Sequence, residues 1–315
     1  MNNGFVFACN SYFYSGLIVT IKSLLRFNPS AKIEVLDTGL SNDQIKDLDS
    51  KKIRVIDIKN KFEMHFQNKR EWHSDFSVYG SLFIDESSFD NIIFCDSDLL
   101  ILDDLSEYFS FIQKYKIVAT KGDSTKSYFH PNGMVRLKEY VTPKGQEVLN
   151  ELYDINWDYV TFNSGFWGIQ KSYYKKLKQK YWYLLEQYES EFTFHDQTFI
   201  NLTVCLDNRC YYDAGFAYNA VNIGKQNSFY NFNSFLKYIF YMLTRQFYHV
   251  NGLHVSYKGI PVKVLHWTGI GKPFLEDSVK AIGNASRPWR EISDCNHKRI
   301  NCERAIEVEQ CYLTL

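Results

Sequence analysis

The sequence predicts an α/β fold with a single twisted, mostly parallel sheet flanked by helices. Short apolar stretches alternate with amphipathic stretches through residues 5–58, an order typical of strands joined by crossover helices. The apolar stretch 92–95 is too short for a helix and is bracketed by charge, which indicates a buried central strand. With 45% hydrophobic residues among 315, the chain can fill the core of one large domain.

Each element is expected from its own local pattern. Residues 5–8 form an apolar first strand, and apolar residues at helical spacing predict a helix over 16–27, which Asn-Pro-Ser at 28–30 ends. Ser41 is a suitable N-cap for a helix through Asp49. Further strands are expected at 32–37, 53–58, 116–120, 162–169, 210–212 and 262–265. Further helices are expected at 76–84, 105–111, 145–153 and 172–188 and from Phe192 onward, with 60–75 as a loop.

The composition limits the partners and the compartment. A net charge of zero gives no general attraction for nucleic acid, so we expect no nucleic-acid partner. No apolar run approaches the roughly 18 residues that a membrane-spanning helix needs. The seven cysteines are odd in number and include no Cys-x-x-Cys pair, which favours reduced thiols in a cytoplasmic protein. A zinc site is a weaker alternative, because the spacing of its candidate ligands matches no common site: Cys295, His297, Cys302 and Cys311.

The motif Asp96-Ser97-Asp98 follows the predicted central strand, at the sheet edge where open α/β folds bind ligands. Its acidic residues stand at i and i+2, so both carboxylates can face one ion. A desolvated carboxylate needs a cation or hydrogen-bond donors, and a divalent metal bound to phosphates meets that need. The alternative is a solvated turn after a strand, which is the commoner explanation of an isolated Asp-x-Asp.

Three further motifs stand at the ends of predicted elements. They are Phe162-Asn163-Ser164-Gly165, His195-Asp196-Gln197 and His266-x-x-Gly269-x-x-Lys272-Pro273. His266 offers a nitrogen ligand, and a histidine beside two carboxylates suits Mn²⁺ better than Ca²⁺. Taken alone, His266 is more simply a satisfied buried histidine, and Asp196 is equally well an N-cap carboxylate. The order and spacing of the four motifs favour one common site.

With these motifs the chain resembles the retaining glycosyltransferases of family 8, which include bacterial lipopolysaccharide galactosyl- and glucosyltransferases and glycogenin. The likeness begins at Val6-Phe7-Ala8, continues through 35–41 and reaches Lys272-Pro273-Phe274, so that it covers most of residues 1–275. The resemblance implies a GT-A fold with a Rossmann-like sheet, a UDP-sugar donor and bound Mn²⁺ or Mg²⁺. It also implies that the anomeric configuration is retained.

The resemblance assigns roles to residues at matching positions. The metal would be bound by Asp96, Asp98 and His266. The donor would be bound by Ala8, Asn10, Asp96, Ser97, Asp123, Asn163, Ser164, Gly269 and Lys272. Gln197 matches the position that faces the anomeric carbon, and an amide is a poor nucleophile, so we prefer a front-face route through an oxocarbenium-like state. Asp196 is the fallback nucleophile for a covalent intermediate.

The chain departs from the family pattern at two places. Asn10 stands where the usual residue is Asp, which would change a charged contact with the nucleoside into a neutral one. The run Tyr79-Gly80-Ser81-Leu82 replaces a Tyr-Ala-Arg-Leu-like run, so the basic residue that would touch the nucleotide is missing. These departures affect the identity of the donor sugar more than the fold.

We expect two parts in the chain: a nucleotide-sugar-binding and catalytic domain, 1–225, and a C-terminal aromatic and helical extension, 226–315. The segment 262–274 of the extension is expected to return to the metal site. The aromatic stretch 226–250 has two interpretations. It is either an interfacial segment that docks the protein on the inner face of a membrane, or a helix that packs on the sheet or lines the acceptor cleft.

The predicted function is a metal-dependent retaining glycosyltransferase. It would transfer a hexose, with galactose or glucose favoured, from a UDP-sugar to an acceptor of a surface polysaccharide, such as lipopolysaccharide or capsule, or to a lipid-linked oligosaccharide. A haloacid-dehalogenase-like phosphatase also places Asp-x-Asp after an apolar strand, but the preceding βαβαβ order fits it poorly. The other alternative is a non-catalytic nucleotide-sugar or glycan-binding protein, against which four retained residues argue: Asp96, Asp98, His266 and Lys272.

Overall fold

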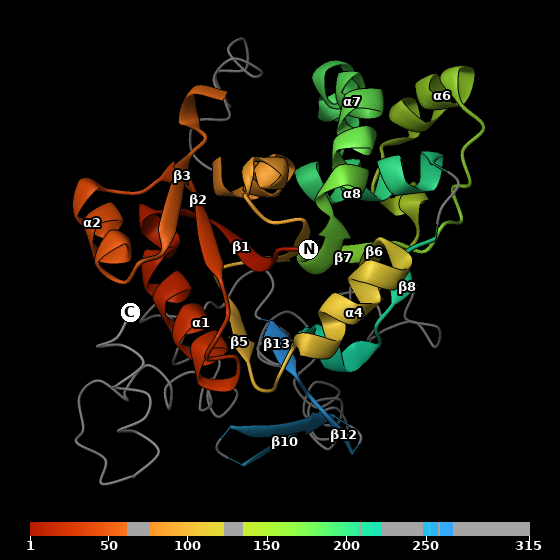
Figure 1. The fold of residues 1–315 in the computed structure, drawn as a ribbon. Helices are drawn as coiled ribbons and strands as arrows, with labels where there is room; N and C mark the ends of the chain where they lie inside the picture. Colours follow the sequence, from red (N-terminus) through yellow and green to blue (C-terminus); the bar gives the residue numbers. More distant parts are fainter. Residues whose placement is uncertain are drawn as a thin grey trace, which may run out of the picture.

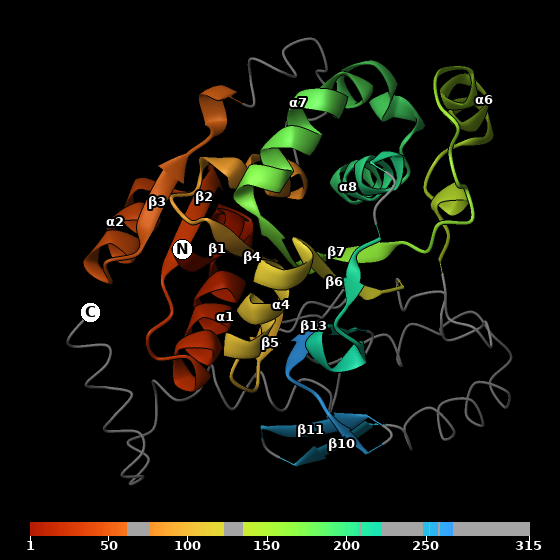
Figure 2. The same cartoon turned by 45° about the vertical axis from the view of Figure 1, so that its right-hand side comes forward.

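The computed structural model describes residues 1–61, 76–122, 135–207, 210–221, 248–251, 253–257 and 259–266. Its centre is a seven-stranded sheet with helices on both faces (Figure 1, Figure 2). From one edge to the other the strands are β3 (Arg54–Asp57), β2 (Ile33–Gly39), β1 (Asn3–Asn10), β4 (Asn91–Cys95), β7 (Phe162–Gln170), β6 (Ile117–Lys121) and β8 (Tyr212–Asp213). The pairings that involve β7 are antiparallel, whereas the others in this sheet are parallel. The predicted mostly parallel sheet is confirmed, with β7 as its reversed strand.

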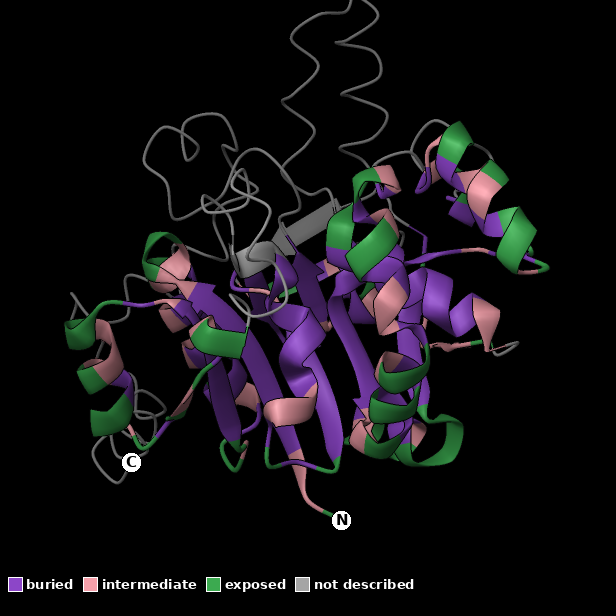
Figure 3. Ribbon diagram, turned by 90° about the horizontal axis from the view of Figure 1, so that it is seen from above, coloured by how far each residue is buried: buried purple, intermediate pink, exposed green. Residues whose placement is uncertain are grey.

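Helices cover the sheet on both sides because both of its faces are apolar. Along β1, Phe5 and Phe7 point to one face while Val6 and Ala8 point to the other, and all four side chains are buried. The first face packs against α1 (Tyr14–Phe27), α2 (Asn42–Ser50) and α4 (Ser106–Tyr115). The second face packs against η3 (Phe76–Glu86), α6 (Pro143–Leu152), α7 (Lys171–Tyr188) and α8 (His195–Leu206). Figure 3 shows the buried strands between helices whose outer faces are exposed.

Local sequence explains where several helices begin. Ser41 caps α2 as predicted: its hydroxyl accepts a hydrogen bond from the backbone N–H of Gln44, and the Gln44 side chain accepts one from the N–H of Ser41. Thr142 caps α6 through the N–H of Gly145, ahead of Pro143 in the first turn. Short 3-10 helices complete the list: η1 (Ser11–Phe13), η4 (Leu137–Glu139), η5 (Glu189–Glu191) and η6 (Phe216–Tyr218).

Two helices differ from their predicted form. The segment expected as a helix over 76–84 is the 3-10 helix η3, which has a kink at Phe83. Glycine at position 80 lowers helix propensity, and it also allows this segment to pack closely on β1. The helix expected from Phe192 begins later, at His195. The φ of His195 is 43°, in the left-handed region, so the residues before it cannot continue the same right-handed helix.

A small second sheet joins distant parts of the chain. It consists of β5 (Leu99–Ile101), β13 (Val264–His266) and β9 (Ala220–Val221), with β13 in the middle. Strand β13 runs antiparallel to β5, so that His266 lies opposite Leu99. The strand expected at 262–265 is therefore present as β13, but it belongs to this sheet and not to the main one. A third sheet contains β10 (Tyr248–Asn251), β11 (His254–Tyr257) and β12 (Ile260–Pro261).

Helix α1 holds β5 in place through buried polar side chains. The Thr20 hydroxyl donates to the carbonyl of Leu99 at 2.8 Å, and the Ser23 hydroxyl accepts from the N–H of Ile101 at 2.9 Å. At the end of the helix, the Asn28 side-chain oxygen accepts from the N–H of Leu105 at 2.8 Å. These contacts pair backbone groups of β5 and of the segment after it that would otherwise be buried without partners.

Among the described residues, no helix combines the length and the apolar character needed to cross a membrane. Four cysteines in this part of the chain are free thiols: Cys9, Cys95, Cys205 and Cys210. The aromatic stretch 226–250 lies outside the described residues apart from its last three, and so does the C-terminal group of Cys295, His297, Cys302 and Cys311. The division of the chain at residue 225 stays a prediction.

We expect Gly80→Ala to lower the free energy of unfolding by about 1–3 kcal/mol, the usual cost of overpacking a rigid contact. A Cβ at position 80 would lie 2.1 Å from the Cβ of Ala8, and the next atom, Cγ2 of Thr38, is 3.3 Å away. The double variant Ala8→Gly/Gly80→Ala moves the methyl group to the other side of this contact and should recover much of the loss. Urea unfolding of the three proteins measures this, and equal losses in the single and double variants would contradict it.

Candidate functional site

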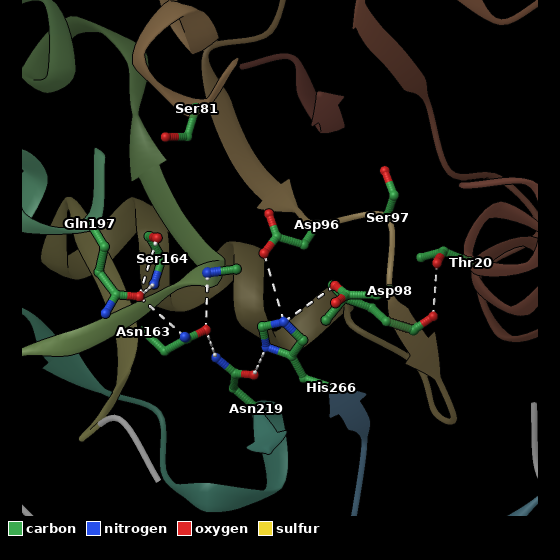
Figure 4. A network of polar contacts seen from close by, with 12 residues as sticks. Thr20, Ser81, Asp96, Ser97, Asp98, Asn163, Ser164, Gln197, Asn219 and His266 are labelled. Carbon is green, nitrogen blue, oxygen red and sulfur yellow. Dashed lines mark hydrogen bonds and ion pairs between the residues drawn. The ribbon is translucent and has the colours of Figure 1, made fainter. Parts of the chain in front are cut away.

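The two acidic residues of Asp96-Ser97-Asp98 meet His266 at one point. Asp96 and Asp98 lie in the turn between β4 and β5, and His266 is the last residue of β13 (Figure 4). The Nε2 atom of His266 lies 3.3 Å from Oδ1 of Asp98 and 3.7 Å from Oδ2 of Asp96. His266 and Asp98 are buried, whereas the Asp96 side chain is 45% exposed. The turn is fixed from β7, because the N–H of Asp96 donates to the carbonyl of Gly165 at 2.8 Å.

This group fits a divalent cation. One ligand atom from each of the three side chains lies within 4.8 Å of the others. Two carboxylates and one imidazole are a donor set suited to Mn²⁺ and acceptable to Mg²⁺. Gly165 keeps the space open: a Cβ there would lie 2.2 Å from Cε1 of His266 and 2.6 Å from Oδ2 of Asp96. A side chain at position 165 would therefore occupy the space between two of the ligands.

A chain of side-chain amides leads away from His266 (Figure 4). Nδ1 of His266 lies 3.1 Å from Oδ1 of Asn219, and Nδ2 of Asn219 donates to Oδ1 of Asn163 at 3.1 Å. Nδ2 of Asn163 donates in turn to Oε1 of Gln197 at 3.1 Å. The chain thus connects three of the predicted motifs through one residue, Asn219, that sequence reasoning had not singled out.

The side chain of Gln197 is tightly held. Besides the contact from Asn163, its oxygen accepts from the N–H of Ser164 at 3.0 Å and from the Ser164 hydroxyl at 3.3 Å. Its amide nitrogen donates to the hydroxyl of Tyr140 at 2.6 Å. An amide oxygen that accepts several hydrogen bonds is a weak nucleophile, and its orientation is fixed by the groups around it. Tyr140 is a second residue of this site that sequence reasoning missed.

Asp196 is a buried carboxyl beside the amide chain. The Ser81 hydroxyl donates to its Oδ2 at 2.5 Å. Ser81 is the residue at which the resemblance implied a basic side chain. Burial raises the pKa of Asp196 to about 7, and the charge of Asp96 acts in the same direction. The hydrogen bonds from Ser81 and from the N–H of Gln197 and the charge of His195 oppose this rise only in part.

The turn before Asp196 has its own polar cluster. Nδ1 of His195 lies 3.0 Å from Oε1 of Glu189 and 2.6 Å from the Tyr79 hydroxyl, which also donates to Glu189 at 2.8 Å. His195 has a positive φ, so a strained residue immediately precedes the Asp196-Gln197 pair. The cluster holds that strained turn against η3. No local sequence pattern marks Glu189, because its role depends on contact with residues far along the chain.

Three predicted donor-binding residues lie at or near the end of β1. Ala8 is buried near this end, and the Ser97 hydroxyl donates to its carbonyl at 3.3 Å. The side-chain oxygen of Asn10 accepts from the N–H groups of Tyr12 and Phe13 and so caps η1. Asn10 therefore has a structural role that its sequence position did not suggest. Three other predicted residues lie outside the described part of the chain: Asp123, Gly269 and Lys272.

Comparisons with known proteins agree with this fold. A profile of glycosyl transferase family 8 matches residues 5–278. No curated protein matches the chain in sequence. Among solved structures, the galactosyltransferase LgtC, crystallised with donor and acceptor sugar analogues, is similar with a TM-score of 0.56 at 18% identity, over 97% of this chain and 99% of that one.

Two longer glycosyltransferases contain a similar fold. The glycosyltransferase GlyE of Streptococcus pneumoniae TIGR4 has a TM-score of 0.58 at 19% identity, over 98% of this chain and 63% of that one. The bifunctional glycosyltransferase WbbM has a TM-score of 0.61 at 17% identity, over 98% of this chain and 51% of that one. These likenesses confirm the predicted GT-A fold. The family match, which spans nearly all of the chain, sets aside the phosphatase alternative and shows that the chain belongs to glycosyl transferase family 8.

Proposed function

We propose that this glycosyltransferase is metal-dependent and retaining, and that it transfers a hexose, with galactose or glucose favoured, from a UDP-sugar to a saccharide acceptor. The observation that carries the proposal is that Asp96, Asp98 and His266 meet at one point, near Asp196 and the hydrogen-bonded side chain of Gln197. Family membership supports a glycosyl transfer. The donor set supports a divalent cation, with Mn²⁺ favoured over Mg²⁺.

The three ligand side chains would hold the cation at the carboxyl end of β4. A bound cation supplies charge neutralisation for a diphosphate and so favours departure of the nucleotide. Asp98 and His266 are buried, so they would form the fixed part of the site, and the more exposed Asp96 would face the donor. Gly165 leaves the room that a cation and its remaining ligands need.

The donor would extend from the end of β1 to the start of β7. Ala8, Asn10 and Ser97 are the proposed nucleoside-binding residues, and Asn163 and Ser164 are proposed to contact the sugar. Asp123, Gly269 and Lys272 stay predictions from the family resemblance. Carboxylate and amide groups suit the sugar because vicinal hydroxyls need paired acceptors and donors.

The environments of Asp196 and Gln197 favour the front-face route over a covalent intermediate. The Gln197 oxygen already accepts hydrogen bonds from Asn163 and Ser164, which leaves it little nucleophilic character. A raised pKa leaves Asp196 partly protonated near neutral pH, and a protonated carboxyl is no nucleophile. We propose that both residues orient the sugar, and that Asp196 is the less favoured nucleophile.

The proposed acceptor is a saccharide of a surface polysaccharide, such as lipopolysaccharide or capsule, or a lipid-linked oligosaccharide. The LgtC structure contains donor and acceptor sugar analogues, which supports a saccharide acceptor by analogy. A cytoplasmic protein that contacts the inner face of a membrane through 226–250 would meet such an acceptor where it is made. This location remains a proposal from the sequence.

The function is tested by incubating the protein with a panel of UDP-hexoses and Mn²⁺ and measuring released UDP. We expect turnover with one or a few donors, and a loss of about 100-fold or more in Asp98→Ala, because several kcal/mol of charge stabilisation would be removed. Asp43→Ala, at an almost fully exposed position on α2, is the matched control and should retain activity. Absence of UDP release with every donor would favour the non-catalytic binding protein, and an active Asp98→Ala would refute the metal assignment.

A second variant tests the space at the cation site. Gly165→Ala should abolish Mn²⁺ binding while the protein stays folded, because the new methyl group would lie between His266 and Asp96. Gly168→Ala is the control on the same strand: its methyl group would instead crowd Ile112 and Tyr108 and lower stability without touching the ligands. Isothermal titration with Mn²⁺ and thermal unfolding separate the two effects. Normal Mn²⁺ affinity in Gly165→Ala would contradict the placement of the cation.

Asp196 gives a prediction for the effect of pH on stability. Its pKa is raised from 3.8 to about 7 in the folded protein, so between these pH values the folded state holds a proton that the unfolded chain has lost. The free energy of unfolding should therefore fall as pH rises through this window, by up to about 1.4 kcal/mol per pH unit for one proton. Asp196→Asn cannot titrate and so lacks this pH-dependent contribution to the free energy of unfolding. The stability of the variant minus that of the wild type should therefore increase from about pH 4 to about pH 7 and then level off. Urea unfolding of both proteins in EDTA at several pH values measures this difference in free energy. A difference that stays constant across the window would contradict the prediction.

A further inference from the structure

The amide chain beside the cation site has a direction that the backbone sets. It runs from His266 through Asn219 and Asn163 to Gln197, and all four side chains are buried (Figure 4). The oxygen and nitrogen of a side-chain amide can exchange places by a flip, so the direction of such a chain must be fixed by an unambiguous donor or acceptor. Two backbone N–H groups of β7, which can only donate, are the unambiguous donors here.

The N–H of Gly165 points at Asn163, and the N–H of Ser164 points at Gln197. Each lies 3.0 Å from a side-chain amide atom, and a backbone N–H can only donate. The atom that each one meets must therefore be the oxygen: Oδ1 of Asn163 and Oε1 of Gln197. The strand thus fixes the orientation of two amides independently of each other.

The orientation of Asn219 follows from that of Asn163. Oδ1 of Asn163 lies 3.1 Å from Asn219, and an oxygen requires a donor, so the atom that faces it is Nδ2 of Asn219. Oδ1 of Asn219 is then the atom that faces His266, at 3.1 Å from its Nδ1. Because an amide oxygen only accepts, Nδ1 of His266 must carry a hydrogen. The atom left to bind a cation is Nε2, which is the one directed at Asp96 and Asp98.

We propose that Asn219 is a positioning residue for the cation site: it fixes the His266 ring with Nε2 toward the cation and ties that ring to β7 and Gln197. The inference rests on the proposed function in one respect, namely that Asp96, Asp98 and His266 bind a cation. A hydrogen bond from the second ring nitrogen of a metal-binding histidine orients the ring and raises its basicity, and its loss costs about 10–100-fold in metal affinity.

The surroundings make this contact difficult to replace. Asn219 and His266 are each 2% exposed, so bulk water has little access to either side chain. Strand pairing brings the two close: in the parallel pair of β13 and β9, His266 lies opposite Val221, and Asn219 stands two residues before Val221, so its amide meets the imidazole diagonally. An apolar residue at position 219 would leave the Nδ1–H of His266 and Oδ1 of Asn163 each without one partner.

The test measures Mn²⁺ binding without donor or acceptor, from the electron paramagnetic resonance signal of free Mn²⁺. We expect Asn219→Leu to bind Mn²⁺ about 10–100-fold more weakly than the wild type. Asn219→Asp keeps an oxygen opposite Nδ1 and should recover most of that affinity, although it loses the donor to Asn163. If the leucine variant does not fold, Asn219→Ser replaces it with the same expected weakening, because a hydroxyl is too short to reach His266.

Two controls keep the outcomes distinct. Asn28→Leu removes another buried asparagine, one that links α1 to Leu105, which follows the end of β5 opposite to the end next to Asp98, so it should lower the melting temperature without changing Mn²⁺ affinity. Asp98→Ala should bind no Mn²⁺, and if it binds as the wild type does, or if the wild type does not bind, the cation part of the proposed function fails. If Asp98→Ala loses binding while Asn219→Leu retains wild-type affinity, or if the leucine and aspartate variants weaken equally, the role of Asn219 is refuted.

Discussion

The site depends on one strand pairing, the antiparallel contact between β5 and β13. Strand β5 begins directly after Asp98, so a strand that pairs with it in this register delivers His266 to the acidic turn. The pairing is stabilised from behind by α1, whose Thr20 and Ser23 contact backbone groups of β5. A shift of one residue in this register would turn His266 to the other face of its strand and separate it from both carboxylates.

Burial explains why the polar residues around this pairing form a continuous network. A buried amide or imidazole without a partner costs about 1–3 kcal/mol, so each polar side chain placed here requires another beside it. His266 contacts Asn219, Asn219 contacts Asn163, and Asn163 contacts Gln197. The cation ligands and the proposed sugar-facing residues are thereby held by the same set of hydrogen bonds.

The departures from the family pattern acquire a physical meaning in the structure. Ser81 stands where the resemblance implied a basic residue, and its hydroxyl donates to the carboxyl of Asp196. This hydrogen bond offsets only part of the effect of burial, which raises the pKa of Asp196. At Asn10, the oxygen of the side chain caps η1, so a residue expected to contact the nucleoside also shapes the turn after β1.

The sequence by itself determined the sheet, most of the helices and four motifs whose residues meet in the site, because apolar periodicity and strand ends are local properties of the chain. The order of the motifs favoured one site, and the family pattern then assigned Asp96, Asp98 and His266 together as the metal ligands. The roles of Asn219, Tyr140 and Glu189 were decided by the tertiary structure alone, since each depends on partners dozens of residues away in sequence. Likewise, no local pattern shows that β13 pairs with β5 and β9 and not with a strand of the main sheet, because the pairing of a strand depends on long-range packing more than on its own residues.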